Sequence, residues 1–144
     1  MKYKVYVAGE KEVKEIESKN IVEELRKTFW DIGGFGLKLY ERVPEYVLLT
    51  YGRRPGGKYD YTLDEWIYTD GELELVAKKD VYDPPSRDDT TYKYRVKNAS
   101  FVIKVHLYGD DFNGKFIYSG RQVEIYGNCP LRWEIEKLKE ELQV

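Results

Sequence analysis

The 144-residue sequence contains one cysteine, one histidine and one methionine, and it has no long apolar run. A single Cys129 cannot form an internal disulfide, and one His with one Cys argues against a structural zinc site. No stretch approaches the ~20 apolar residues that span a bilayer, and the N-terminus lacks the apolar core of a signal peptide. These absences predict a cytoplasmic protein with no membrane partner and no cofactor.

Thermolabile residues are also scarce, whereas charged residues are abundant. The chain has two Gln and four Asn, against 35% charged residues and 14 Tyr. This balance is the one reported for proteins that work at high temperature. It predicts a hyperthermophilic source, either an archaeon or a virus of one, in which a small host-regulatory factor would be typical.

Strand patterns dominate the sequence. Alternating polar and apolar residues predict strands at 2–8, 36–42, 45–51, 58–62, 65–69, 72–78, 91–97, 101–108, 115–118 and 122–126. Residues 12–17 fit either a strand or an early helix start. The Asp70-Gly71 pair predicts a hairpin between 65–69 and 72–78, and the prolines in 83–89 predict a loop.

Two segments have helical spacing instead. Asn20 and Glu23 have the spacing of a capping box, which predicts a helix over about 20–32 that ends at Gly33 and Gly34. Its apolar residues are Ile21, Val22, Leu25 and Phe29. Pro130 predicts a second helix over about 131–142, with one apolar stripe formed by Leu131, Ile135, Leu138 and Leu142. Because strands and helices do not alternate, we expect one α+β domain over residues 1–144, with a mainly antiparallel sheet, either curved or closed into a small barrel.

Charge is unevenly distributed along the chain. Residues 31–58 carry a net +2, residues 60–90 a net −7 and residues 91–126 a net +3. Complementary surfaces of this kind favour a protein-interaction module. The predicted acidic face for a basic protein partner consists of Asp60, Asp64, Glu72 and Glu74. A homo-oligomer is left open.

A nucleic-acid-binding module is the alternative, because aromatic rings interleaved with basic side chains can stack bases and hold phosphates. The residues predicted to do so lie in the 51–61 loop and the 91–97 strand. They are Tyr51, Arg53, Arg54, Lys58, Tyr59, Lys93 and Arg95.

Two short motifs are interpreted as turns. Residues 52–58 match the G-x-x-x-x-G-K spacing of a phosphate-binding loop, but Tyr59 replaces the required Ser or Thr and a strand follows instead of a helix. We interpret this segment as a basic hairpin turn. Residues Tyr108–Asp111 resemble the metal-binding hairpin of viral RNA polymerases, but the chain is too short to be one. Asp and Gly favour a turn there as well.

His106 supports a second alternative, a small enzyme. It shares a strand face with Lys104 and Tyr108, and the opposite face is the predicted core: Phe101, Ile103, Val105 and Leu107. A partly exposed His can act as a general base near pH 7. The sequence offers no matched nucleophile and orienting group, so we favour a binding protein over an enzyme.

Overall fold

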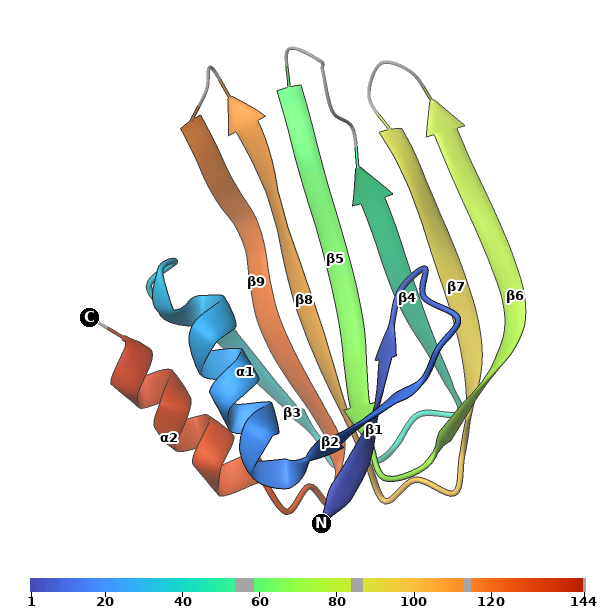
Figure 1. Ribbon diagram of the computed structural model, residues 1–144, viewed down its shortest axis with the longest axis vertical. Helices are drawn as coiled ribbons and strands as arrows, with labels where there is room; N and C mark the ends of the chain where they lie inside the picture. The colour runs from blue at the N-terminus through green and yellow to red at the C-terminus, as the bar shows by residue number, and fades with distance from the viewer. Residues whose placement is uncertain (54–58, 84–86, 113–114, 144) are drawn as a thin grey trace.

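The computed structural model describes the backbone of residues 1–53, 59–83, 87–112 and 115–143, and the side chains of these except 53, 59–63, 82–83, 87–88, 110–112 and 115–119. In chain order the elements are β1 (Lys2–Val7), β2 (Lys14–Glu17), α1 (Ser18–Trp30), β3 (Gly36–Tyr40), β4 (Tyr46–Arg53), β5 (Tyr59–Thr69), β6 (Glu72–Asp83), β7 (Arg87–Lys97), β8 (Phe101–Phe112), β9 (Lys115–Gly127) and α2 (Arg132–Leu142) (Figure 1). Neither helix, over the residues described, is long and apolar enough to cross a membrane.

The strands form one open sheet. Their order is β3-β9-β8-β5-β4-β7-β6, and β1 pairs with both β5 and β2. Every pairing is antiparallel except the parallel pair β3–β9. The predicted α+β class with a mainly antiparallel sheet is therefore confirmed, and the sheet is not a closed barrel.

The sheet divides at β5. Along one edge β5 pairs with β8 over its whole length. Along its other edge it pairs with β4 at Thr62 and Leu63, and with β1 from Trp66 to Thr69. We call the point between these pairings the fork. Beyond it, β4, β7 and β6 form one arm, and the strands on the helix side form the other.

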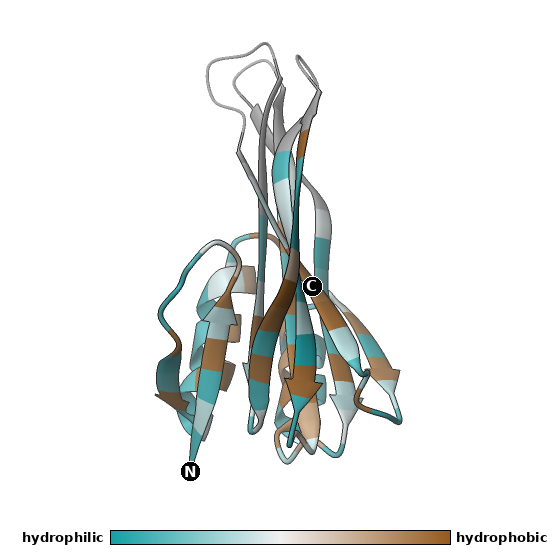
Figure 2. Cartoon of the chain, turned by 90° about the vertical axis from the view of Figure 1, so that its right-hand side faces the viewer, coloured by the Kyte–Doolittle hydropathy of each residue, from teal (hydrophilic) through white to brown (hydrophobic). Residues whose placement is uncertain are grey.

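The two faces of the helix-side arm contribute to two separate apolar clusters. Between the helices and the helix-side arm lie Ile21, Leu25 and Phe29 of α1, Ile135, Leu138 and Leu142 of α2, and Phe101, Ile103 and Val105 of β8. The helical stripes and this face of β8 are thus buried as predicted. In Figure 2 the hydrophobic bands of the strands lie beside the helices, toward the end of the sheet that holds the N-terminus.

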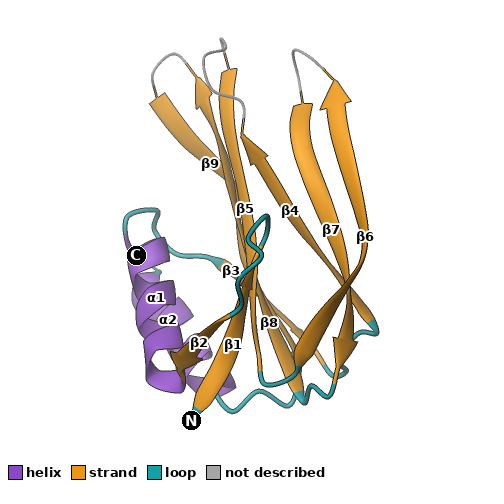
Figure 3. Cartoon of the chain, turned by 45° about the vertical axis from the view of Figure 1, so that its right-hand side comes forward, coloured by secondary structure: helices purple, strands orange, loops and turns teal. Residues whose placement is uncertain are grey.

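The second cluster lies between the two arms, which diverge in Figure 3. Its buried members are Tyr6, Ala8, Val47, Leu49, Ile67, Tyr94 and Val102. Because Val102 and Ile103 of β8 belong to different clusters, β8 is buried on both faces. The sequence pattern predicted only one buried face for this strand.

The capping box predicted at Asn20 is wrong. Helix α1 begins at Ser18, its N-cap residue is Glu17, and no side chain caps it. The backbone N–H of Ser18 instead donates to Met1 O at 3.0 Å, because β2 runs directly into the helix while paired with β1. The end of the helix agrees with the prediction: Gly33 and Gly34 have φ of 74° and 105°, values that favour glycine.

The hairpin predicted at Asp70-Gly71 is also wrong. Strand β5 does not pair with β6, whose partner among the described residues is β7. Asp70 Oδ1 instead accepts hydrogen bonds from the backbone N of Ser100 at 3.0 Å and of Phe101 at 3.3 Å. Asp70 and Gly71 therefore connect β5 to β6, which lie in different arms of the sheet. The turn before β8 provides the hydrogen-bond donors for the Asp70 carboxylate.

Several turns and breaks that were predicted between strands are absent, because the chain continues to pair with neighbouring strands at these positions. The segments 58–62 and 65–69 are one strand, β5, and 115–118 and 122–126 are one strand, β9. The turn predicted at Tyr108–Asp111 is wrong, because β8 continues to Phe112 between β5 and β9. Within the loop predicted at 83–89, Asp83 belongs to β6 and residues 87–89 belong to β7, while residues 84–86 lie outside the described residues. The undecided segment 12–17 contains strand β2.

Candidate functional site

The four residues of the predicted acidic face do not form one surface. The side chain of Asp60 lies outside the described residues. Glu72 and Glu74 lie on the outermost strand β6, where Lys4 Nζ is 3.1 Å from Glu72 and Lys97 contacts Glu74. Exposed ion pairs of this kind neutralise charge but contribute little stability. Of the three whose side chains are described, only Asp64 lies on the helix side of the sheet, in a groove described below.

The predicted nucleic-acid residues are divided as well. Arg54 and Lys58, and the side chains of Arg53 and Tyr59, lie outside the described residues. Lys93 and Arg95 lie over the ring of Tyr46, with Nζ and Cζ at 4.4 and 5.4 Å from its centroid. Tyr46 pairs with Arg95 and Tyr51 with Thr90, so strand alternation places Tyr51 on the opposite face.

His106 contacts a residue that the sequence pattern did not single out, Glu65. Glu65 lies directly opposite His106 in the β5–β8 pair and is 5% exposed. One carboxylate oxygen, Oε2, contacts His106 Nδ1 and lies 3.5 Å from Lys104 Nζ. The ring of Tyr108 packs edge-on against His106 at 4.3 Å between centroids. His106 thus belongs to a group of polar side chains around the buried Glu65 carboxylate, and His106 and Lys104 are themselves partly exposed.

The position of Glu65 at the fork explains its burial. If the β4–β5 register of Gly52 with Leu63 continued, Thr50 would stand opposite Glu65. The backbone carbonyl of Glu65 is already occupied, because Ala8 N donates to it at 3.1 Å. Thr50 N instead donates to Glu65 Oε1 at 2.7 Å. The Glu65 side chain therefore accepts the hydrogen bond that the β5 backbone would accept if β4 continued to pair with it. At this point β1 replaces β4 as the neighbour of β5. The signal in the sequence that could have identified Glu65 is its position as a charged residue that alternates with Leu63 and Ile67 along the strand.

This cluster predicts a specific acid sensitivity. Burial raises the pKa of Glu65, but the contacts with His106, Lys104 and the Thr50 N–H together hold it below the ordinary value of 4.5. A lowered pKa in the folded state contributes stability above pH ~4.5 that is lost as the pH falls through the folded pKa. We expect the free energy of unfolding, measured by urea titration, to decrease more steeply between about pH 5 and pH 3 in the native protein than in Glu65→Gln. Equal slopes would contradict this assignment.

A groove of about 920 Å³ lies on the helix side, bounded by β1, β2, α1, β5 and β8. Its apolar and aromatic lining consists of Val5, Val7, Ile16, Trp66, Tyr68 and Leu107. Four carboxylates also line it: Glu15, Glu23, Glu24 and Asp64. The two cations in the lining are Lys14, whose Nζ lies 3.9 Å from Glu10, and Lys27. The groove therefore carries an excess of negative charge over an apolar floor.

A hydrogen-bond chain fixes part of this floor. Trp66 Nε1 donates to Tyr68 Oη at 3.0 Å, and Tyr68 Oη donates to Glu24 Oε2 at 2.6 Å. Burial first, and then the bond to Glu24, raise the pKa of Tyr68, so its hydroxyl stays a donor. The chain links β5 to α1 and orients the Glu24 carboxylate. Sequence reasoning predicted a binding role for Asp64 and did not single out Glu24 or Trp66, which come together with it only in the folded chain.

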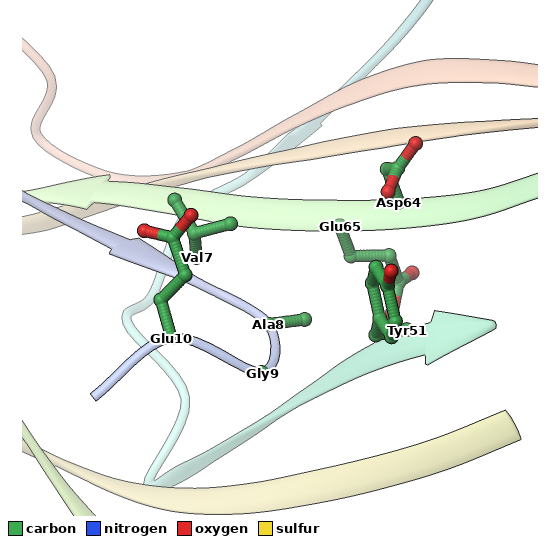
Figure 4. A pocket seen from close by; sticks show the side chains of 7 residues that line it. All are labelled: Val7, Ala8, Gly9, Glu10, Tyr51, Asp64 and Glu65. Atoms are coloured by element: carbon green, nitrogen blue, oxygen red, sulfur yellow. The ribbon is translucent and has the colours of Figure 1, made fainter. Parts of the chain in front are cut away.

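The groove continues toward the fork. A neighbouring cavity of about 420 Å³ shares Val7 and Asp64 with it and is also lined by Glu10, Tyr51 and Glu65. Figure 4 shows Asp64 and Glu65 on opposite sides of β5, with Glu65 directed toward Tyr51. Asp64 thus stands at the junction of the two hollows.

Among the side chains that the structure describes, no three His, Cys, Asp or Glu residues lie together so as to hold a metal ion. Burial raises the pKa of Cys129 to about 11, which leaves its thiol protonated near neutral pH. Comparison of the chain with protein-family models, with curated proteins and with solved structures finds no match. The functional assignment therefore rests on the residues of the groove.

Proposed function

We propose that this protein is an interaction module whose groove binds a basic, extended segment of a partner protein. The observation that supports this is the groove itself, with four carboxylates and two lysines around an apolar floor. Complementary charge guides association and discriminates against acidic partners, while the apolar floor supplies most of the contact energy.

The expected binding is modest and sensitive to salt. Each exposed charge contact contributes about 0.2–1 kcal/mol, so several contacts are needed before the charge of the segment matters. Glu24 and Asp64, which adjoin the aromatic floor, are the two carboxylates expected to matter most.

The test is a binding titration with a fluorescein-labelled octapeptide in which Lys, Arg and Gly are mixed. We expect the double variant Glu24→Gln/Asp64→Asn to raise Kd about 5–10-fold, which corresponds to about 1–1.4 kcal/mol. The Gln side chain keeps an oxygen acceptor for Tyr68, so the groove floor should remain in place. Fluorescence anisotropy at low and moderate salt measures the change.

Glu41→Gln is the matched control, because Glu41 is exposed and does not line the groove. An octapeptide with Glu in place of the basic residues should not bind. Equal binding of both peptides, or an equal effect of the control and the double variant, would contradict the proposal. Binding of a labelled oligothymidine that is lost in Lys93→Ala/Arg95→Ala would establish the nucleic-acid alternative instead.

From the composition we further propose a cytoplasmic location, a heat-adapted archaeal or viral source and a host-regulatory role, and formation of a homo-oligomer is left open. An enzyme acting through His106 is likewise a prediction, and the buried contact with Glu65 gives that histidine a structural role.

A further inference from the structure

We infer that the groove selects arginine over lysine in the segment it binds, because Trp66 and carboxylates from different elements surround the same hollow. This inference rests on the proposed function and names the side chain that the groove recognises. The residues that carry it are Trp66 and Asp64 on β5 and Glu24 on α1.

Trp66 is held in a defined place within the groove. Its indole N–H is bonded to Tyr68, which is 1% exposed and in turn bonded to Glu24. Trp66 itself is only partly buried and packs against the helix-side core. An indole that is fixed and still accessible is the best aromatic partner for a cation, and arginine uses such rings more often than lysine does.

The carboxylates approach this hollow from separate elements. Glu24 comes from α1, Asp64 from β5 and Glu15 from β2. The planar guanidinium of arginine presents five donors in a rigid fork and can serve acceptors that lie in different directions while it stacks on a ring. The ammonium of lysine is a compact point charge and cannot stack in this way.

The apolar floor adds a second reason. Val5, Val7, Ile16 and Leu107 contribute to the lining, so a cation that enters the groove loses part of its hydration. A guanidinium is more weakly hydrated than an ammonium and is the cation favoured in partly buried ion pairs. The aliphatic part of an arginine or a lysine side chain can cover the apolar floor equally well. The difference in affinity therefore arises from the guanidinium and ammonium groups.

The experiment compares an octapeptide of alternating Arg and Gly with one of alternating Lys and Gly, both labelled with fluorescein and measured against the native protein. We expect the Arg peptide to bind at least about 5-fold more tightly at the same salt concentration. Trp66→Leu should reduce this ratio to less than 2-fold while salt-dependent binding persists. Trp66→Phe, which retains an aromatic ring, should keep part of the preference.

The possible outcomes separate the two proposals. Equal affinity of the two peptides for the native protein overturns arginine selection and leaves the basic-segment function intact. Absence of binding by both peptides overturns both. A preference that survives unchanged in Trp66→Leu, in a variant shown by its thermal unfolding to be folded, overturns the role assigned to Trp66.

Discussion

Replacement of Glu65 by Ala is expected to lower the free energy of unfolding by about 3–5 kcal/mol, the usual cost of removing a buried carboxylate from its ion pair and hydrogen bonds. The variant would leave Thr50 N without its acceptor at the fork and would separate His106 and Lys104 from their carboxylate. Urea unfolding followed by circular dichroism measures the change. The loss should be accompanied by faster amide exchange in β4, which depends on this contact where it leaves β5.

Two other variants test whether the buried carboxylate of Glu65 is responsible for this loss of stability. Glu65→Gln keeps an oxygen for Thr50 N but loses the charge, so it should cost about 1–3 kcal/mol. Glu74→Ala removes a carboxylate from the exposed pair with Lys97 and should leave the free energy of unfolding close to that of the native protein, because solvent screens such a pair. If Glu65→Ala were as mild as Glu74→Ala, the Glu65 carboxylate would contribute no more to stability than a carboxylate in an exposed ion pair.

Gly127→Ala is expected to be destabilising by about 2–5 kcal/mol, because two costs act at the same position. Gly127 has φ of 82°, and an added Cβ would lie 2.4 Å from Ser100 O and 2.7 Å from Val43 Cγ2. Ser100 O cannot shift freely, since it accepts a hydrogen bond from Asn128 N at 2.9 Å. Thermal unfolding monitored by calorimetry provides the measurement.

Gly33→Ala is the matched control for this substitution. Gly33 has a similar φ of 74°, but an added Cβ would meet nothing within 4 Å. It should therefore show only the conformational cost of about 1–2 kcal/mol. Equal destabilisation by the two substitutions would mean that the close approach of the chain at Ser100 does not matter.

Sequence reasoning succeeded where structure is decided by near neighbours along the chain. Ile21, Leu25 and Phe29 fall on one face of a helix whatever surrounds it, and their burial followed from spacing alone. The alternation in 101–107 identified a buried face of β8 for the same reason. It failed at Asp70-Gly71, since a turn motif does not specify which strands pair beyond it.

The candidate site shows the same division. Asp64 was identified as an acidic binding residue from the charge of its own segment. The other carboxylates of the groove come from β2 and α1, about 40–50 positions earlier in the chain, and no local pattern links them to Asp64. The predicted partners Glu72 and Glu74, although only eight and ten positions away, lie on a different arm and are paired with lysines.

The sequence by itself determined an α+β domain rich in antiparallel strands, two amphipathic helices and their buried stripes, because periodicity and helix-ending glycines act within a few residues. Only the tertiary structure decided that β5 divides its edge between β1 and β4, that Glu65 occupies the fork, and that Asp64, Trp66 and Glu24 share a groove. The physical reason is that strand pairing and burial act between segments far apart in the chain, and their free energies depend on which surfaces meet.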